Sequence, residues 1–66
     1  MEIVVNGKPC STAPDQTILG LLRELQLDPA RLAVELDRRI VKQPLWSTTV
    51  LAPGARLEIV QFVGGG

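Results

Sequence analysis

A single amphipathic stripe limits this chain to folds that contain one main helix. Four apolar residues follow the helical spacing i, i+3, i+4 and i+7, and they are Ile18, Leu21, Leu22 and Leu25. Asp15 or Thr17 can cap the start of this helix, because each has a side-chain oxygen that accepts hydrogen bonds from first-turn amides. Asp28-Pro29 ends it, since a residue before proline avoids the α conformation. We therefore expect one helix near residues 17–26, which can cover only one face of a sheet.

The residues before the helix predict a β-hairpin. Ile3 and Val5 alternate along the first segment, as in a half-buried strand. Asn6-Gly7 then predicts a type I′ turn, which needs a positive φ at both of its central residues. Residues 8–13 are expected to return antiparallel, and Pro9 favours an edge position, because it has no amide hydrogen for a ladder.

The residues after the helix predict the rest of a sheet. Three further strand segments are expected, and they are residues 32–36, Ile40-Val41 and residues 56–62. The connections between them are expected to be a turn at residues 37–39, a one-turn helical corner at Pro44-Leu45-Trp46 and a type II turn at residues 52–55. Trp46 is expected to fill one end of the core.

This order of elements predicts an α+β fold of the β-grasp (ubiquitin-like) class. A hairpin, one helix and further strands give a mixed sheet of roughly four to five strands, with the main helix packed on one face. The core is expected to contain apolar residues of the helix and of alternate strand positions: Ile3, Val5, Ile18, Leu21, Leu22, Leu25, Val34, Leu36, Leu57 and Ile59.

Length, charge and cysteine content exclude several classes of protein. The chain has 66 residues, which predicts a single domain over residues 1–63 and a flexible tail at residues 64–66. Seven basic and seven acidic residues give a net charge of zero, which argues against a nucleic-acid partner. Cys10 is the only cysteine, so no internal disulfide is expected and a cytoplasmic location is favoured. No apolar run approaches the roughly 20 residues of a membrane span, and no signal peptide is expected.

The glycines at the end of the sequence are the candidate reactive site. Gly64, Gly65 and Gly66 have no side chains, so they can enter a slot that is too narrow for other residues. The α-carboxylate of Gly66 is a poor electrophile until an enzyme adenylates it with ATP. An amine, a thiol or a persulfide sulfur can then attack the acyl carbon. The alternative is a frayed chain end, which is common at termini.

Two apolar residues of the last strand are candidates for partner binding. Val60 and Phe62 alternate with Ile59, so they are expected on the sheet face away from the helix, near the root of the tail. The alternative is that a neighbouring strand end covers them. The sequence has no histidine and no Cys/His cluster, so it predicts neither a metal site nor a catalytic residue of its own. Cys10 is expected to be a small strand residue without chemistry.

The chain resembles the ThiS family of ubiquitin-like sulfur carrier proteins over its whole length. The resemblance rests on the segments "VNGK", "QTILGLL", "LAVELDRRIV" and "PLW", and above all on "LEIVQFVGGG". It implies that an E1-like adenylyltransferase activates the carboxylate of Gly66, which then takes sulfur from a persulfide protein and becomes a thiocarboxylate. It also implies that a thiazole synthase uses this sulfur for the thiazole ring of thiamine, with Gly64 and Gly65 threaded into each partner's active site.

The resemblance implies a carrier that is not itself an enzyme, is a monomer when free and binds no cofactor, since the activating enzyme uses the ATP. Three other interpretations stay open. The small sulfur-carrier subunit of molybdopterin synthase has a similar fold and a glycine tail. A ubiquitin-like protein modifier would join its last glycine to a lysine. A β-grasp binding module for RNA is disfavoured by the zero net charge, because such binding depends on phosphate neutralisation.

Overall fold

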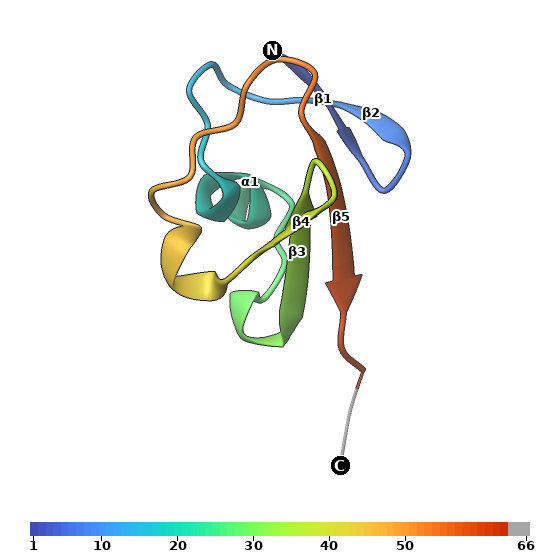
Figure 1. Cartoon of the computed structure of the whole chain (residues 1–66). Helices are drawn as coiled ribbons and strands as arrows, with labels where there is room; N and C mark the ends of the chain where they lie inside the picture. Colours follow the sequence, from blue (N-terminus) through green and yellow to red (C-terminus); the bar gives the residue numbers. More distant parts are fainter. Residues whose placement is uncertain (64–66) are drawn as a thin grey trace.

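The computed structural model describes residues 1–63, which form a five-stranded mixed sheet with one α-helix on one of its faces (Figure 1). The strand order is β2-β1-β5-β3-β4, with β1 and β5 parallel and the other neighbours antiparallel. The elements, where η marks a short 3-10 helix, are β1 Glu2–Val5, β2 Lys8–Ser11, α1 Ile18–Glu24, η1 Pro29–Arg31, β3 Leu32–Leu36, β4 Arg39–Val41, η2 Gln43–Leu45 and β5 Arg56–Gln61. This arrangement confirms the predicted β-grasp class.

Helix α1 begins where the sequence predicts and ends earlier. Thr17 is its N-cap, and the hydroxyl oxygen of Thr17 accepts a 3.0 Å hydrogen bond from the amide of Gly20. The helix ends at Glu24, and Gln26 adopts a positive φ of 58° that no helix can continue through. The side chain of Gln16 lies across Gly20, and its Oε1 atom would have to move aside for a Cβ there.

The core lies between α1 and the sheet and contains most of the predicted residues. Its buried apolar residues are Ile3, Ile18, Leu21, Leu22, Leu32, Val34, Trp46, Leu51, Ala55 and Leu57. Three predicted core residues are only half-buried and pack at its margin: Val5, Leu36 and Ile59. The prediction that Leu25 is buried is wrong, because the helix ends before it and leaves 38% of it exposed. Trp46 fills the core as predicted, and its indole nitrogen donates a 2.7 Å hydrogen bond to the carbonyl of Val41.

Two tight turns close the hairpins, and each has two consecutive residues with positive φ. Asn6 and Gly7 have φ values of 51° and 80°, as the predicted type I′ turn requires. Asp37 and Arg38 have φ values of 48° and 71°, so the second hairpin has the same kind of two-residue turn. Arg39 was predicted to belong to this turn, but it begins β4.

The first residue of each turn also continues the pairing with β5, through its side chain. In regular parallel pairing the amide of Ile59 would donate to the main-chain carbonyl of Asn6, but Oδ1 of Asn6 accepts this bond instead, at 2.7 Å. In the antiparallel pairing of β3 with β5, Oδ1 of Asp37 accepts a 3.0 Å bond from the amide of Arg56 in the same way. Both turn residues leave the β conformation, and their side-chain oxygens replace the displaced carbonyls.

Candidate functional site

Strand β5, which leads into the predicted reactive tail, is the central strand of the sheet (Figure 1). It pairs with β1 on one side and with β3 on the other. Beyond the last residue of β5, the amide of Phe62 still donates a 2.8 Å hydrogen bond to the carbonyl of Arg31. Val63 follows and is 94% exposed. The backbone is therefore held by the fold as far as Phe62, and this fixes the point from which the chain continues.

The residues predicted to carry the chemistry are the next three in the sequence. Gly64, Gly65 and Gly66 lie outside the described residues 1–63, so the adenylation site and the threaded tail stay predictions. The described residues include the surface around the end of β5, which lies next to these glycines in the sequence.

Val60 and Phe62 are both exposed, at 55% and 58%. Val60 pairs with Ala33 on the sheet face away from α1, whereas its neighbour Ile59 pairs with the buried Val34 on the helix side. This is the alternation that the sequence predicts. In the described chain no neighbouring strand end buries either residue, so both side chains are available to a partner. That a partner binds them stays a prediction.

Ile40 is a third exposed apolar residue on this open face, and the sequence did not reveal it. It pairs with Glu35 across β3 and β4 and is 76% exposed. A shallow hollow of about 110 Å³ is lined by Ala33, Val34, Glu35, Ile40, Glu58 and Val60. The signal in the sequence was the pair Ile40-Val41, since only one of two adjacent strand residues can face the helix. This strand has only three residues, so the sequence does not show which of the two faces the helix.

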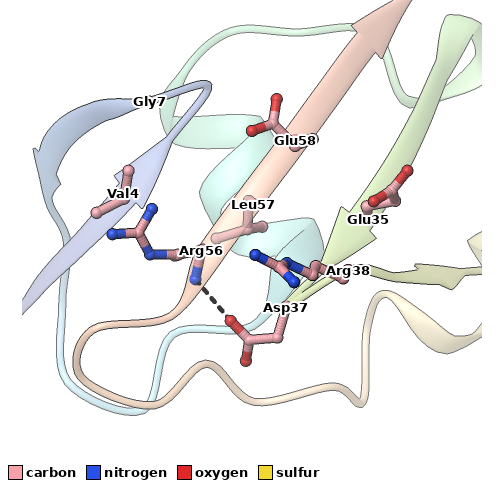
Figure 2. Close-up of a pocket in the computed structure, with 8 residues that line it drawn as sticks. All are labelled: Val4, Gly7, Glu35, Asp37, Arg38, Arg56, Leu57 and Glu58. Carbon is pink, nitrogen blue, oxygen red and sulfur yellow. Dashed lines mark hydrogen bonds between the residues drawn. The ribbon is translucent and has the colours of Figure 1, made fainter.

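The opposite end of the open face is polar. A larger hollow of about 570 Å³ is lined by residues of β1, β3, β5 and the two tight turns: Val4, Gly7, Glu35, Asp37, Arg38, Arg56, Leu57 and Glu58 (Figure 2). The guanidinium group of Arg56 extends toward Val4 in this view. Arg56 is the first residue of β5 and Arg38 lies in the turn between β3 and β4, whereas Val60 lies near the end of β5. The open face therefore changes from charged to apolar along β5, in the direction of the tail.

The described residues contain no second set of groups arranged for chemistry. Among residues 1–63, no three His, Cys, Asp or Glu side chains lie close enough together to hold a metal ion. Cys10 is half-buried, on β2 opposite the core residue Ile3. The buried Thr12 donates hydrogen bonds to both carboxylate oxygens of Glu24, at 3.1 and 3.0 Å, which ties the loop before α1 to the helix. In the same part of the chain, no helix is long and apolar enough to cross a membrane.

Several known proteins are similar in sequence to this chain. The chain matches the ThiS family over residues 3–66. Two thiazole synthases, from Paramagnetospirillum magneticum and Magnetococcus marinus, are 36% and 35% identical to it over all 66 of its residues, but the chain spans only 20% of the length of each. The sulfur carrier protein ThiS of Escherichia coli is 27% identical over the whole length of both chains.

A solved structure agrees with these sequence matches. The crystal structure of the thiamine biosynthesis protein ThiS from Geobacter metallireducens has a TM-score of 0.86 to this chain and 29% sequence identity. The similarity covers 100% of both chains. The fold of this chain is therefore that of a solved ThiS protein.

Proposed function

The chain belongs to the ThiS family, and from this membership we propose that it is a sulfur carrier protein of thiamine biosynthesis. The observation that carries the proposal is that the family match runs to Gly66, so it includes the glycines as well as the fold. The whole-length match to the Escherichia coli sulfur carrier supports the same function. In this role the chain is a protein substrate of other enzymes rather than an enzyme, and a cytoplasmic location stays part of the proposal.

The proposed chemistry takes place at the carboxylate of Gly66. A carboxylate oxygen attacks the α-phosphorus of ATP on the activating enzyme, pyrophosphate leaves, and an acyl-adenylate forms. The terminal sulfur of a donor protein's persulfide then attacks the acyl carbon, and AMP leaves. A thiol next attacks the donor's sulfur in the resulting acyl disulfide, so the thiocarboxylate leaves while the donor and this thiol are oxidised to a disulfide.

The glycines are proposed to be the part of the chain that enters the partners. The carboxylate must reach near-attack distance from the α-phosphorus inside another protein's active site. Side chains at Gly64 and Gly65 would thicken the chain where clearance is least, and their absence suits a narrow channel. ATP is then a substrate of the E1-like activating enzyme and not a ligand of this chain.

Val60 and Phe62 are proposed to contact both partners, the activating enzyme and the thiazole synthase. Each enzyme must draw the same glycines into its active site, and the exposed apolar side chains lie directly before them. Contact with these side chains would fix the direction of the tail and lower the entropy lost when the tail becomes ordered. The matches to parts of two thiazole synthases support the choice of that enzyme as the sulfur acceptor.

The test of this function is the intact mass of the protein after incubation with ATP, the purified activating enzyme, a persulfide donor and a thiol. We expect a mass gain that corresponds to the replacement of one oxygen by sulfur. The matched control is a chain that ends at Gly65, which is expected to gain no sulfur. An unchanged mass of the full chain would refute the carrier function, and a covalent link to a lysine would indicate a protein modifier.

A further inference from the structure

The end of β5 has fewer strand neighbours than its beginning. β1 pairs with β5 only as far as Leu57. β4 pairs with β3 only from Val34 onward, so in the described sheet the first two residues of β3 have no neighbour in β4. These two residues lie opposite Val60 and Gln61. The last part of β5 therefore belongs to a two-stranded segment, and such segments twist more strongly than wider sheets do.

Asn6 bonds to β5 directly before this two-stranded segment. Alternate residues of β5 bond to opposite sides of the strand. On the β3 side, the amide of Phe62 donates to the carbonyl of Arg31. On the β1 side, the carbonyl of Leu57 accepts a 2.8 Å bond from the amide of Asn6. Ile59 is the next residue that faces β1, and both of its main-chain groups bond to the side chain of Asn6, at 2.7 and 3.2 Å. One side chain thus takes the place of a strand where the two-stranded segment begins.

Side-chain packing beside this part of β5 is incomplete. A hollow of about 320 Å³ is lined by residues that follow α1 and by residues around the ends of β1 and β5: Val5, Asn6, Leu25, Leu27, Leu32, Ile59 and Gln61. Leu25 is partly exposed and Ile59 is half-buried. Close packing against a filled core holds a strand in one position. Because packing is loose here, the direction of the strand end depends more on the two hydrogen bonds of Asn6.

We propose that Asn6 is a positioning residue, which sets the direction in which β5 presents Val60, Phe62 and the glycines that follow them. The inference rests on the proposed function, because the activating enzyme must bind these two side chains and receive the tail at the same time. With Asn6 in place, the free carrier already holds the segment in the direction that the enzyme requires, which lowers the entropy lost on binding. Without the two bonds, the enzyme has to realign the segment. Asn6 itself acts through Ile59 and makes no contact with the enzyme.

The test measures ATP–pyrophosphate exchange by the purified activating enzyme at varied concentrations of the carrier. Asn6→Gly removes both side-chain bonds, and glycine tolerates the positive φ of the turn. We expect its KM to rise about tenfold while kcat stays unchanged, because realignment weakens binding but the bound tail lies as in the wild type. Asn6→Asp keeps the acceptor for the amide of Ile59 and loses the donor, so its KM should lie between the other two.

Asp37→Gly is the matched control, because it makes the same kind of change in the turn beside the beginning of β5. This variant also loses a side-chain bond to β5 and should be less stable to urea, but its KM should equal that of the wild type. A rise in KM as large as that of Asn6→Gly would show that the exchange assay reports stability alone, and it would overturn the inference.

Residual dipolar couplings of the free proteins measure the direction of the strand end itself. Relative to the couplings of α1, those of the amides of Gln61 and Phe62 should change in Asn6→Gly and stay unchanged in Asp37→Gly. A raised KM with unchanged couplings would indicate a direct contact between Asn6 and the enzyme and would overturn the inference. Equal KM values for the wild type and Asn6→Gly would overturn it as well, and both results leave the proposed function intact. Failure of the wild type to support exchange would overturn the proposed function and the inference together.

Discussion

The turns at Asn6-Gly7 and Asp37-Arg38 perform the same task on opposite sides of β5. Each closes a hairpin, each has positive φ at both residues, and each uses a side-chain oxygen in place of a main-chain carbonyl. They differ in what else the side chain can do. The amide of Asn6 also donates through Nδ2 to the carbonyl of Ile59, at 3.2 Å, whereas the carboxylate of Asp37 has no hydrogen to donate.

This difference shows how one side chain can replace a residue of a β-ladder. Asn6 bonds both the amide and the carbonyl of Ile59, so the pairing on that side of β5 extends beyond the last residue of β1. Asp37 secures only the amide of Arg56, while its own amide donates to the carbonyl of Arg56 at 2.8 Å. Asn6 therefore holds the half of β5 that leads to the tail, and Asp37 holds the half where the strand begins.

Replacement of Asn6 by alanine should cause the largest loss among changes at the two turns. The variant Asn6→Ala removes two side-chain hydrogen bonds, worth about 1 kcal/mol each. It also puts alanine at a positive φ that asparagine tolerates better, which costs about 1 kcal/mol more. We expect the free energy of unfolding in urea to fall by about 3 kcal/mol. Asn6→Gly is the control, because glycine tolerates the positive φ and should lose only the part due to hydrogen bonds.

Asp37→Ala should cost less, because one hydrogen bond is lost instead of two. We expect a fall of about 2 kcal/mol in the free energy of unfolding, because the bond to Arg56 is lost and because alanine tolerates the positive φ less well than aspartate does. The same urea titration measures it. A loss as large as that of Asn6→Ala would show that the second hydrogen bond of Asn6 contributes nothing.

Exchange of amide and carboxylate should separate the two turns further. Asn6→Asp keeps the acceptor for the amide of Ile59, but it places a carboxylate oxygen beside the carbonyl that Nδ2 now serves. We expect a loss of about 1 kcal/mol. In the described chain, Asp37 makes one hydrogen bond through its side chain, and Asp37→Asn keeps it, so this exchange should change stability by about 0.5 kcal/mol or less. Equal effects of the two exchanges would contradict the assignment of different roles.

The smallest effect is expected at the second residue of each turn, and it should be a gain. Arg38 has a φ of 71°, a conformation that costs a residue with a Cβ about 1 kcal/mol, whereas Gly7 occupies the same place in the other turn without this cost. Arg38→Gly should therefore stabilise the protein by about 0.5 kcal/mol, after subtraction of the greater chain entropy of glycine. The change in the midpoint of thermal unfolding measures this gain in stability. A lower midpoint for the variant would contradict the claim that Arg38 is strained at its positive φ.

Local motifs were sufficient to predict these turns, but not their bonds to β5. Asn6-Gly7 indicates a type I′ turn by itself, since few other dipeptides accept two positive φ values. The bonds from Asn6 reach a residue 53 positions away, and no local pattern shows which backbone groups will be opposite. The same limit applies to Gly20, because no local pattern shows that the side chain of Gln16 lies across it.

The periodicity of apolar residues predicted the fold class, because it shows which face of each helix or strand is apolar. It gave wrong or missing predictions near the ends of elements and in short ones. Leu25 keeps the helical spacing, yet the helix ends at Glu24 and leaves it partly exposed. Ile40 belongs to a strand too short to show alternation, so an exposed residue of the candidate site was missed. Val60 and Phe62 were found because β5 is long enough to show which residues alternate with the core.

The central place of β5 also governs the order in which the molecule can fold. The two hairpins, β1 with β2 and β3 with β4, join residues that are close in the sequence, whereas β5 pairs with β1 across some 50 residues. Contacts between neighbours in sequence form quickly, and the closure of long loops is slow. A two-stranded hairpin is barely stable alone, so neither persists until β5 enters between them. Val60 and Phe62 thus come into register in the same event that completes the sheet. An enzyme that binds them as proposed would therefore select chains that have finished folding.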